Sequence, residues 1–393
     1  MSLPQAVTIT DTRWPSVALG SCARLVNGRA YAAAELLEQG KFPVLRVGNL
    51  FTSDHWYYSN MDLEPEKYCG PGDLLYAWSA SFGPCIWTGP KAIYHYHIWK
   101  VIPGPELDKQ YCYYVLRWVT EAVRASGHGI AMIHVTKSGM EKWQIPLPPL
   151  VEQRRIARIL KEHSAAVERA RAAAEAQLKA AKALPAAYLR EAFEGDESRS
   201  WTSYRLGDLI ERHNEIIHPG DCTSGEAEFV GLEHIEPNTG RRIGSVRIDL
   251  AKLTGRKPTF REGQIVYGYL RPYLNKVWIA EFDGCSSVDQ FAFQVRADRA
   301  DARFVAMFMR SDTFLRRSAV VTTTGQLPRI GIDEIMAVEI DLPPTVAEQA
   351  RISGSVSDRL ATAYRLTASC QTELAVIDAV PAALLRSAFQ GRL

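Results

Sequence analysis

Paired cysteines are the first feature that this 393-residue sequence lacks. Its cysteines are odd in number, stand apart from one another, and never form a Cys-x-x-Cys pair or join histidines at metal-ligand spacing. This pattern excludes a disulfide framework and the usual zinc sites, so we expect reduced thiols that serve mainly in packing. The seven residues are Cys22, Cys69, Cys85, Cys112, Cys222, Cys285 and Cys370.

Long apolar runs and an excess of basic residues are also missing. No stretch of eighteen or more apolar residues occurs, and no basic segment followed by an apolar one opens the chain. We therefore expect a cytoplasmic protein without a membrane partner. The 46 basic side chains are balanced by 44 acidic ones, for a net charge of +2. A nucleic-acid-binding surface would have to arise from local sorting of charge.

Motifs for catalysis are missing as well. The sequence has no Gly-x-x-x-x-Gly-Lys-Ser/Thr loop for ATP, no His-Glu-x-x-His and no Gly-x-Ser-x-Gly. The Leu-Pro-Pro runs at Leu147 and Leu342 lack the acidic or amide residue before and the aromatic residue after that hold a flipped base in adenine methylases. His95 and His97 alternate along a predicted strand with no third ligand nearby, which favours packing over metal binding. Catalysis is thus expected to belong to partner proteins.

What the sequence does contain is an internal repeat. Each copy begins with Leu-Pro-Pro and a Glu-Gln pair, continues through an Ala-rich stretch, and closes with Pro-Ala-Ala and a Phe. From Glu152 to Gly195 the second copy follows at a constant offset of 196 residues without a gap. Because the spacing is kept while alanines and charges vary, the repeat predicts a helix whose length matters.

The repeat divides the chain into four parts: 1–146, 147–195, 196–341 and 342–393. The first and third parts consist mainly of short predicted β-strands, with one helix each, at Tyr111 to Ala125 and Ala302 to Ser318. Tandem copies related by a two-fold axis would place the two long helices antiparallel. The predicted fold class is therefore α+β, with two mixed, mainly β domains joined by two long antiparallel helices in pseudo-two-fold symmetry.

The repeated helices carry clear signals at both ends. Tandem prolines suit a first helical turn, and Glu152 and Glu348 lie near the positive end of the helix dipole. A heptad reading from Ile156 gives seams of small residues with a few polar ones, which favours two helices packed closely together. Pro185 and Pro381 are expected to break or kink the helices before their ends.

These features resemble the specificity subunit of a Type I restriction-modification system. The resemblance covers essentially the whole chain and depends on three segments: Ile145 to Pro149 with Glu152 to Ile156, Leu342 to Pro344 with Glu348 and Gln349, and Ala388 to Leu393. It implies that two target-recognition domains each read one half of a bipartite, asymmetric DNA sequence while the helices fix the gap between the halves. In the second copy one extra residue, Ala347, shifts the Glu-Gln pair, which puts the start of that helix in question.

The resemblance also implies partners and their cofactors. Two methylation subunits would dock on the helices, two restriction subunits would be able to join them, and S-adenosylmethionine and ATP would bind those partners and not this chain. We expect no catalytic or metal site here. The residues expected in the spacer and in partner docking are Glu152, Gln153, Arg155, Ile156, Leu160, Phe193, Glu348, Gln349, Ile352, Val356 and Phe389.

Candidates for DNA contact come from loops with basic, amide and aromatic residues. The segment after Tyr269 offers an arginine for guanine or phosphate, a tyrosine for stacking, an amide and a lysine; a solvated hairpin turn explains it equally well. Its counterpart after Trp78 is uncharged, and the glycine-containing loops before each long helix and small basic clusters, among them Arg256 with Lys257, complete the set. The residues expected to contact DNA are Arg271, Tyr273, Asn275, Lys276, Gln326, Arg329, Arg241, Arg242, Ser79, Ser81, His128 and Lys137.

Three other interpretations remain open from the residues alone. In the first, the chain is an adaptor for another defence or modification complex, and the neighbouring genes would identify that complex. In the second, the chain is a nuclease or methylase with unrecognised motifs, and turnover by the purified chain would show it. A purely structural scaffold is the last interpretation, although two elaborate mixed domains exceed what a spacer needs.

Overall fold

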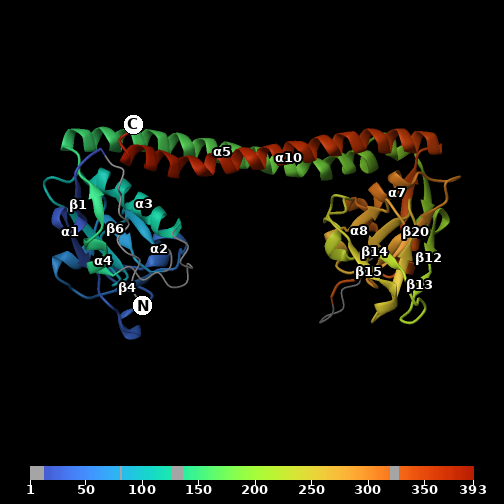
Figure 1. Cartoon of the computed structure of the whole chain (residues 1–393), viewed down its shortest axis with the longest axis horizontal. Helices are drawn as coiled ribbons and strands as arrows, with labels where there is room; N and C mark the ends of the chain where they lie inside the picture. The colour runs from blue at the N-terminus through green and yellow to red at the C-terminus, as the bar shows by residue number, and fades with distance from the viewer. Residues whose placement is uncertain (1–12, 80–81, 126–135, 319–326) are drawn as a thin grey trace. The chain divides into compact units, whose positions relative to one another are not determined.

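The computed structural model describes residues 13–79, 82–125, 136–318 and 327–393. The chain divides into two compact units (Figure 1). Unit 1 consists of Met1–Ala174 and Glu373–Leu393, and unit 2 consists of Glu175–Thr372. Each unit therefore combines one mainly β segment with parts of both long helices.

Unit 1 contains two four-stranded sheets and a short two-stranded one. The first sheet is antiparallel, in the order β2 (Ala23–Asn27), β9 (Ile98–Pro103), β6 (Leu74–Ala77) and β7 (Gly83–Ile86). The second is mixed, in the order β4 (Tyr57–Ser59), β3 (Phe42–Leu45), β8 (Ala92–Tyr94) and β5 (Tyr68–Cys69). The short sheet pairs β1 (Ser16–Ala18) with β10 (Gln144–Pro146). The helices of this segment are α1 (Leu19–Cys22), α2 (Val47–Phe51), α3 (Lys109–Ala125) and α4 (Lys137–Glu141).

Unit 2 repeats this plan. Its antiparallel sheet has the order β12 (Ile210–His213), β20 (Gln290–Val295), β17 (Ile265–Gly268) and β18 (Val277–Ile279). Its mixed sheet has the order β13 (Ile216–Ile217), β16 (Lys257–Phe260), β19 (Gly284–Ser286), β14 (Glu226–Val230) and β15 (Val246–Asp249). The short sheet pairs β11 (Thr202–Arg205) with β21 (Glu339–Leu342). Its short helices are α6 (Leu206–Leu209), α7 (Ala302–Met309), α8 (Asp312–Arg317) and α9 (Ile332–Ala337).

The strand registers make the two units comparable residue by residue. Tyr76 of β6 lies opposite Trp99 of β9, and Tyr267 of β17 lies opposite Phe291 of β20. In the sequence Tyr76 and Tyr267 each follow a glycine by four residues, Gly72 and Gly263, and this correspondence extends to their partners on the neighbouring strand. The predicted α+β class, with two mixed, mainly β domains and two long helices, is confirmed.

The helix expected from Ala302 to Ser318 is instead two helices, α7 and α8. The Ser311 side chain caps the second helix by accepting a hydrogen bond from the Phe314 N–H, at 3.2 Å, and it donates to the carbonyl of Phe308. A serine that bonds both backbone segments favours a helix start over a helix interior. The expectation of one continuous helix was therefore wrong.

The long helices are α5 (Leu150–Glu194) and α10 (Val346–Phe389), and both continue through their proline. Of the expectation that Pro185 and Pro381 break or kink them, the break was wrong, because the last turns are held by buried side chains: Leu189 and Phe193 on α5, Leu385 and Phe389 on α10. That packing offsets the missing backbone hydrogen bond. The questioned start of α10 lies at Val346, where the Thr345 hydroxyl accepts from the Glu348 N–H at 3.2 Å.

The two helices run antiparallel within each unit. In unit 1 Arg171 of α5 pairs with Asp378 of α10 at 3.3 Å, and the Arg155 guanidinium donates to the Leu393 carbonyl at 2.7 Å. In unit 2 Arg359 of α10 pairs with Glu191 of α5 at 2.6 Å. In each unit, therefore, the beginning of one long helix packs against the end of the other.

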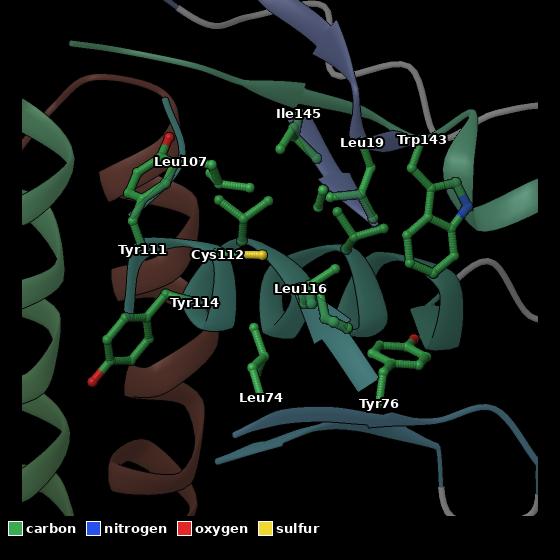
Figure 2. Packing of buried hydrophobic residues seen from close by; sticks show 14 of the residues in the cluster. Leu19, Leu74, Tyr76, Leu107, Tyr111, Cys112, Tyr114, Leu116, Trp143 and Ile145 are labelled. Carbon is green, nitrogen blue, oxygen red and sulfur yellow. The ribbon is translucent and has the colours of Figure 1, made fainter. Parts of the chain in front are cut away.

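The core of unit 1 joins its sheets to the helix pair. Side chains of α3 meet the first sheet at Leu74 and Tyr76 and the β1–β10 region at Leu19 and Ile145 (Figure 2). Phe389 of α10 completes this core against Tyr111 and Trp118, at ring-centroid distances of 5.6 and 5.0 Å. Burial raises the pKa of the Cys22 thiol in this core to about 11. All seven cysteines are free thiols, as expected.

Unit 2 has the equivalent anchor, contributed by the other helix. Phe193 of α5 packs against Phe304 and Phe308 of α7, at 5.1 and 5.5 Å between ring centroids. An aromatic residue at the end of each long helix therefore fills the core of the unit in which the other long helix begins.

Buried glutamines fasten the first turn of each long helix. In unit 1 the Gln153 amide donates to the carbonyls of Glu106 and Pro148, both at 2.8 Å, and accepts from the Asp108 N–H at 2.7 Å. Both this residue and its equivalent, Gln349, are buried. We call these two side chains the glutamine clasps.

The clasp of unit 2 repeats every one of these contacts. Gln349 donates to the carbonyls of Arg299 and Pro343, both at 3.4 Å, and accepts from the Asp301 N–H at 2.9 Å. Asp108 and Asp301 also lie at the same place in their units, just before α3 and α7. The glutamine of the repeated Glu-Gln pair thus joins each long helix, by hydrogen bonds, to the start of the helix in its mixed segment.

Among the described residues, α10 is the one helix long and apolar enough, by length and composition, to cross a membrane, with a mean hydropathy of 1.2 over eighteen residues. Only 11% of that stretch is buried. The same helix holds α5 through Arg359 in unit 2 and Asp378 in unit 1. We therefore assign α10 to helix pairing, with an exposed face left over.

Replacing either clasp by alanine should destabilise its own unit. Gln153→Ala leaves the buried Pro148 carbonyl and the part-buried Asp108 N–H and Glu106 carbonyl unpaired, which costs on the order of 1 to 3 kcal/mol; Gln349→Ala should do the same in unit 2. Denaturant unfolding of the full chain measures the effect. The matched control is Gln177→Ala on the exposed face of α5, and equal stability of all three variants would refute the clasp.

Candidate nucleic-acid interface

A fixed aromatic residue stands at the end of β17 in unit 2. The Tyr269 ring stacks on Phe291 of β20, with 4.5 Å between centroids and 24° between planes. Its hydroxyl donates to the Val288 carbonyl at 2.9 Å, and its backbone N–H donates to the Asp289 carbonyl at 3.1 Å. The stack and these two hydrogen bonds hold the ring in one orientation.

Several arginines surround this ring. The Arg212 guanidinium lies over Phe291, 4.8 Å from the ring centroid. Burial raises the pKa of the Tyr269 phenol and Asp289 raises it further, whereas Arg329, Arg256 and Arg212 act in the opposite direction. Because these three guanidiniums lower the pKa of the Tyr269 phenol, all three lie near enough to interact with it electrostatically.

Two loops that the sequence suggested separately meet here. Leu270 forms a β-bridge with Arg329, the Arg271 N–H donates to the Pro328 carbonyl at 2.7 Å, and the Ile330 N–H donates to the Tyr269 carbonyl at 3.2 Å. Arg271 adopts a left-handed backbone conformation, with φ of 53°. The loop after β17 and the segment before α9 therefore form one surface that carries Arg271 and Arg329.

We call Arg212, Arg256, Arg271 and Arg329 the arginine patch. All four side chains are exposed, and within the described part of the chain none of them has a carboxylate at ion-pair distance. Unpaired exposed arginines beside an aromatic ring are suited to phosphate contact and to forked hydrogen bonds with guanine. Tyr273, which is 56% exposed, stands on the same loop.

The other two residues predicted on this loop have structural partners. Asn275 is buried, has a left-handed φ of 50°, and its amide donates to the Arg310 carbonyl. The Lys276 ammonium donates to the Leu232 carbonyl. In this structure their polar groups hold the loop, and neither is presented to DNA as we expected.

The two adjacent arginines of unit 2 are neutralised. Arg241 pairs with Glu236 at 2.6 Å and lies over the Tyr364 ring at 4.9 Å. Arg242 pairs with Glu281 at 2.9 Å and lies over Phe282. Because each guanidinium already pairs with a carboxylate, its attraction for a phosphate is weaker.

An open groove of about 920 Å³ lies elsewhere in unit 2, along the mixed sheet. Its lining includes Glu215, Glu226, Glu228 and Asp283, which bind its two arginines, Arg247 and Arg261. Four carboxylates against two guanidiniums make it acidic, which disfavours phosphate. Within the described ranges no three His, Cys, Asp or Glu residues are placed to hold a metal ion.

Unit 1 has an equivalent fixed aromatic residue, Trp78, at the end of β6. We call Tyr269 with Phe291, and Trp78 with Trp99, the aromatic frames of the two units. The Trp78 indole N–H donates to the Tyr96 carbonyl at 2.9 Å, and the Trp78 backbone N–H donates to the His97 carbonyl at 3.1 Å. Its ring stacks on Trp99 of β9, at 5.7 Å and 20°. Trp78 thus makes the same three interactions as Tyr269 in unit 2, with the residues at equivalent positions.

The surroundings of Trp78 are mainly aromatic, and the exposed Arg46 lies near enough to act on His95. Tyr96, which is 40% exposed, lies between His95 and His97, with ring centroids at 4.4 and 3.9 Å, and His97 lies 4.7 Å from Trp78. Burial lowers the pKa of His95 to about 4, with His97 and Arg46 acting in the same direction. We call Trp78, His95, Tyr96 and His97 the aromatic cluster.

The remaining DNA-contact candidates of the sequence are only partly described. Ser79 follows Trp78 directly and is half-buried. Lys137 begins α4 and lies 3.7 Å from Glu141. Ser81, His128 and Gln326 lie outside the described residues.

The residues expected in the spacer and in docking lie mostly inside the units. Glu152 pairs with Arg155 at 2.8 Å, which lowers the pKa of its carboxyl, and Glu348 is half-buried in the first turn of α10. Ile352 packs against the core of unit 2. The buried ones are Gln153, Ile156, Leu160, Phe193, Gln349, Val356 and Phe389. These seven hold the helices to the units and leave no surface for a partner, which corrects the docking part of our expectation for them.

Sequence reasoning missed Arg212, His95 and Tyr96 as members of the two surfaces. Arg212 lies on a strand, opposite Phe293, and its place beside Tyr269 depends on the register of two strands. Tyr96 belongs to the turn between β8 and β9. No local signal in the sequence marks either position.

Known proteins resemble this chain in sequence. Residues 12–179 match the family model of the Type I restriction modification DNA specificity domain. The EcoDI specificity subunit of Escherichia coli, a Type I restriction enzyme component, is 24% identical over 97% of this chain and 88% of its own length. The MjaVIII specificity subunit of Methanocaldococcus jannaschii is 28% identical over 38% of this chain and 35% of its own.

Solved structures share the fold over the full chain. A chain from a study of complex assembly and conformational transition of the type I R-M system covers 100% of both chains, with a TM-score of 0.74 and 18% identity. The HsdS subunit of Thermoanaerobacter tengcongensis has a TM-score of 0.56 and 17% identity, covering 100% of this chain and 99% of its own. By its sequence matches and its fold, the chain is similar to the specificity subunits of Type I restriction-modification systems.

Proposed function

We propose that each unit of this specificity subunit reads one half of a bipartite, asymmetric DNA site. The observation that carries the proposal is the exposed arginine patch, held on an aromatic frame that unit 1 repeats. Exposed arginines without carboxylate partners supply phosphate neutralisation and base contact, and the repeated frame supplies one such surface for each half-site. The division into recognition segments 1–146 and 196–341 and spacer segments 147–195 and 342–393 follows from this proposal.

The long helices have two roles in the proposal. They fix the number of unread base pairs between the half-sites, and they dock two methylation subunits, through which two restriction subunits join. The exposed apolar side chains suit docking: Val151 on α5 is 81% exposed, and Leu366 and Val376 on α10 are 46% and 62% exposed. Apolar side chains in water favour burial against a partner.

Catalysis in this proposal belongs to the partners, which bind S-adenosylmethionine and ATP and act with this chain on DNA in the cytoplasm. Co-expression with the methylation subunit followed by footprinting on the cognate duplex tests the whole arrangement. Two protected half-sites with an unprotected gap are expected. Protection of one continuous stretch would refute the bipartite arrangement.

Arg271→Ala and Arg329→Ala should each weaken binding to the half-site read by unit 2. A fork to a base is worth about 1 to 3 kcal/mol, and its removal relaxes specificity at that position; removal of an arginine that binds phosphate weakens all sequences alike. Competition binding of the methylase complex with half-site variants separates the two effects. Arg247→Ala, an exposed arginine already paired with Glu228, is the matched control and should bind as the unaltered complex does.

Lengthening the helix pair should lengthen the gap and leave the bases read unchanged. Seven residues inserted in α5 between Ala170 and Ala183, with seven in α10 between Leu366 and Asp378, add about 10 Å, or about three base pairs at about 3.4 Å each. Methylome sequencing of the host reports half-sites and gap together. As the companion experiment, exchange of residues 1–145 should change one half-site only; a helix insertion that alters the bases read would contradict the spacer role.

A further inference from the structure

The two aromatic frames have different neighbours: arginines in unit 2 and mainly aromatic rings in unit 1. Trp78 and Tyr269 make equivalent hydrogen bonds and stacks, so the surfaces built on them occupy the same place in their units. Unit 2 places Arg212, Arg256 and Arg329 near its frame and Arg271 on the loop that follows, each without a carboxylate partner among the described residues. Unit 1 places aromatic rings around its own.

At two of these positions, the cations of unit 2 correspond to uncharged residues in the sequence of unit 1. Arg212 lies opposite Phe293 in the strand pair β12–β20, and the equivalent pair in unit 1 is Leu25 opposite Val101. Two residues after the frame aromatic, unit 2 has Arg271 and the sequence of unit 1 has Ala80. The segment of sequence from 126 to 135 contains no lysine or arginine either.

The titration of His95 adds to this contrast. Its pKa is about 4, so this imidazole is neutral at neutral pH. The arginine that acts on His95 is Arg46, which itself lies over the Tyr57 ring at 5.4 Å. The exposed member of the aromatic cluster is the Tyr96 ring, which presents a flat, polarisable face beside His97.

We propose that unit 1 binds its half-site through uncharged contacts of Tyr96 and the aromatic cluster with base edges and sugars, while the arginine patch of unit 2 supplies the phosphate contacts. This inference rests on the proposed half-site reading. Each neutralised phosphate of duplex DNA releases counterions and adds about 0.9 to the slope of log K against log salt. Contact of an uncharged ring with base edges and sugars neutralises no phosphate, so it adds affinity without that dependence. The salt dependence of binding therefore originates mainly in unit 2.

Salt titrations of the complete methylase complex test this inference. Affinity for the cognate duplex is measured at several salt concentrations for the unaltered complex, for Tyr96→Ala, and for the double variant Arg271→Ala with Arg329→Ala. The double variant should lower the salt slope by about 0.9 for each phosphate that it leaves without an arginine. Tyr96→Ala should weaken binding by about 5- to 100-fold at every salt concentration with the slope unchanged.

The control for unit 1 is Tyr96→Phe, which keeps the ring and should keep the affinity. The frame itself is spared, because Trp78 bonds the backbone carbonyl of residue 96; unaltered thermal unfolding of Tyr96→Ala checks this. A lowered slope in Tyr96→Ala, an unchanged affinity in that variant, or an unchanged slope in the arginine double variant would overturn the inference. Failure of the proposed function is seen separately, as an unaltered complex that does not distinguish the cognate duplex from a scrambled one.

Discussion

The structure of each unit depends on one buried amide in the first turn of a long helix. Gln153 and Gln349 each satisfy two carbonyls and one N–H, joining the end of the preceding strand, the start of the long helix and the start of α3 or α7. Buried backbone groups must be paired, and a single side chain pairs three of them here. The angle between the mixed segment and its helix is thereby constrained by hydrogen bonds as well as by apolar packing, which has little directional preference of its own.

This constraint explains which parts of the repeat diverge. The strand order, the frame aromatics and the anchors Phe193 and Phe389 are tied to buried neighbours, so a change in any of them disturbs a packed interior. Exposed side chains such as Arg271 in the loop after β17 and Tyr96 in the turn between β8 and β9 have no such obligation. One framework therefore carries arginines in unit 2 and aromatic rings in unit 1, and the chemistry of recognition varies without cost to the fold.

Local patterns in the sequence predicted the features that depend on them. The repeat indicated the two long helices and the α+β class, because period, proline pairs and spacing are local signals. Asn275 and Lys276 have types suited to DNA, but their partners Arg310 and Leu232 lie more than thirty residues away. The same holds for Arg242, whose carboxylate is Glu281. Whether a polar side chain is free depends on such distant pairings, which strand register decides and spacing along the chain does not.

Charge pairing also explains how a nearly neutral chain carries a cationic surface. In residues 201–341 basic and acidic side chains are present in nearly equal numbers. Particular arginines form ion pairs with carboxylates: Arg241 with Glu236, Arg242 with Glu281 and Arg317 with Asp341. The arginine patch stands where the described part of the chain places no such partner, so its field is not cancelled at short range and acts on a phosphate within about one Debye length, about 8 to 10 Å. Net charge therefore says little about nucleic-acid binding in this family of folds; the decisive quantity is which arginines the fold leaves without a carboxylate.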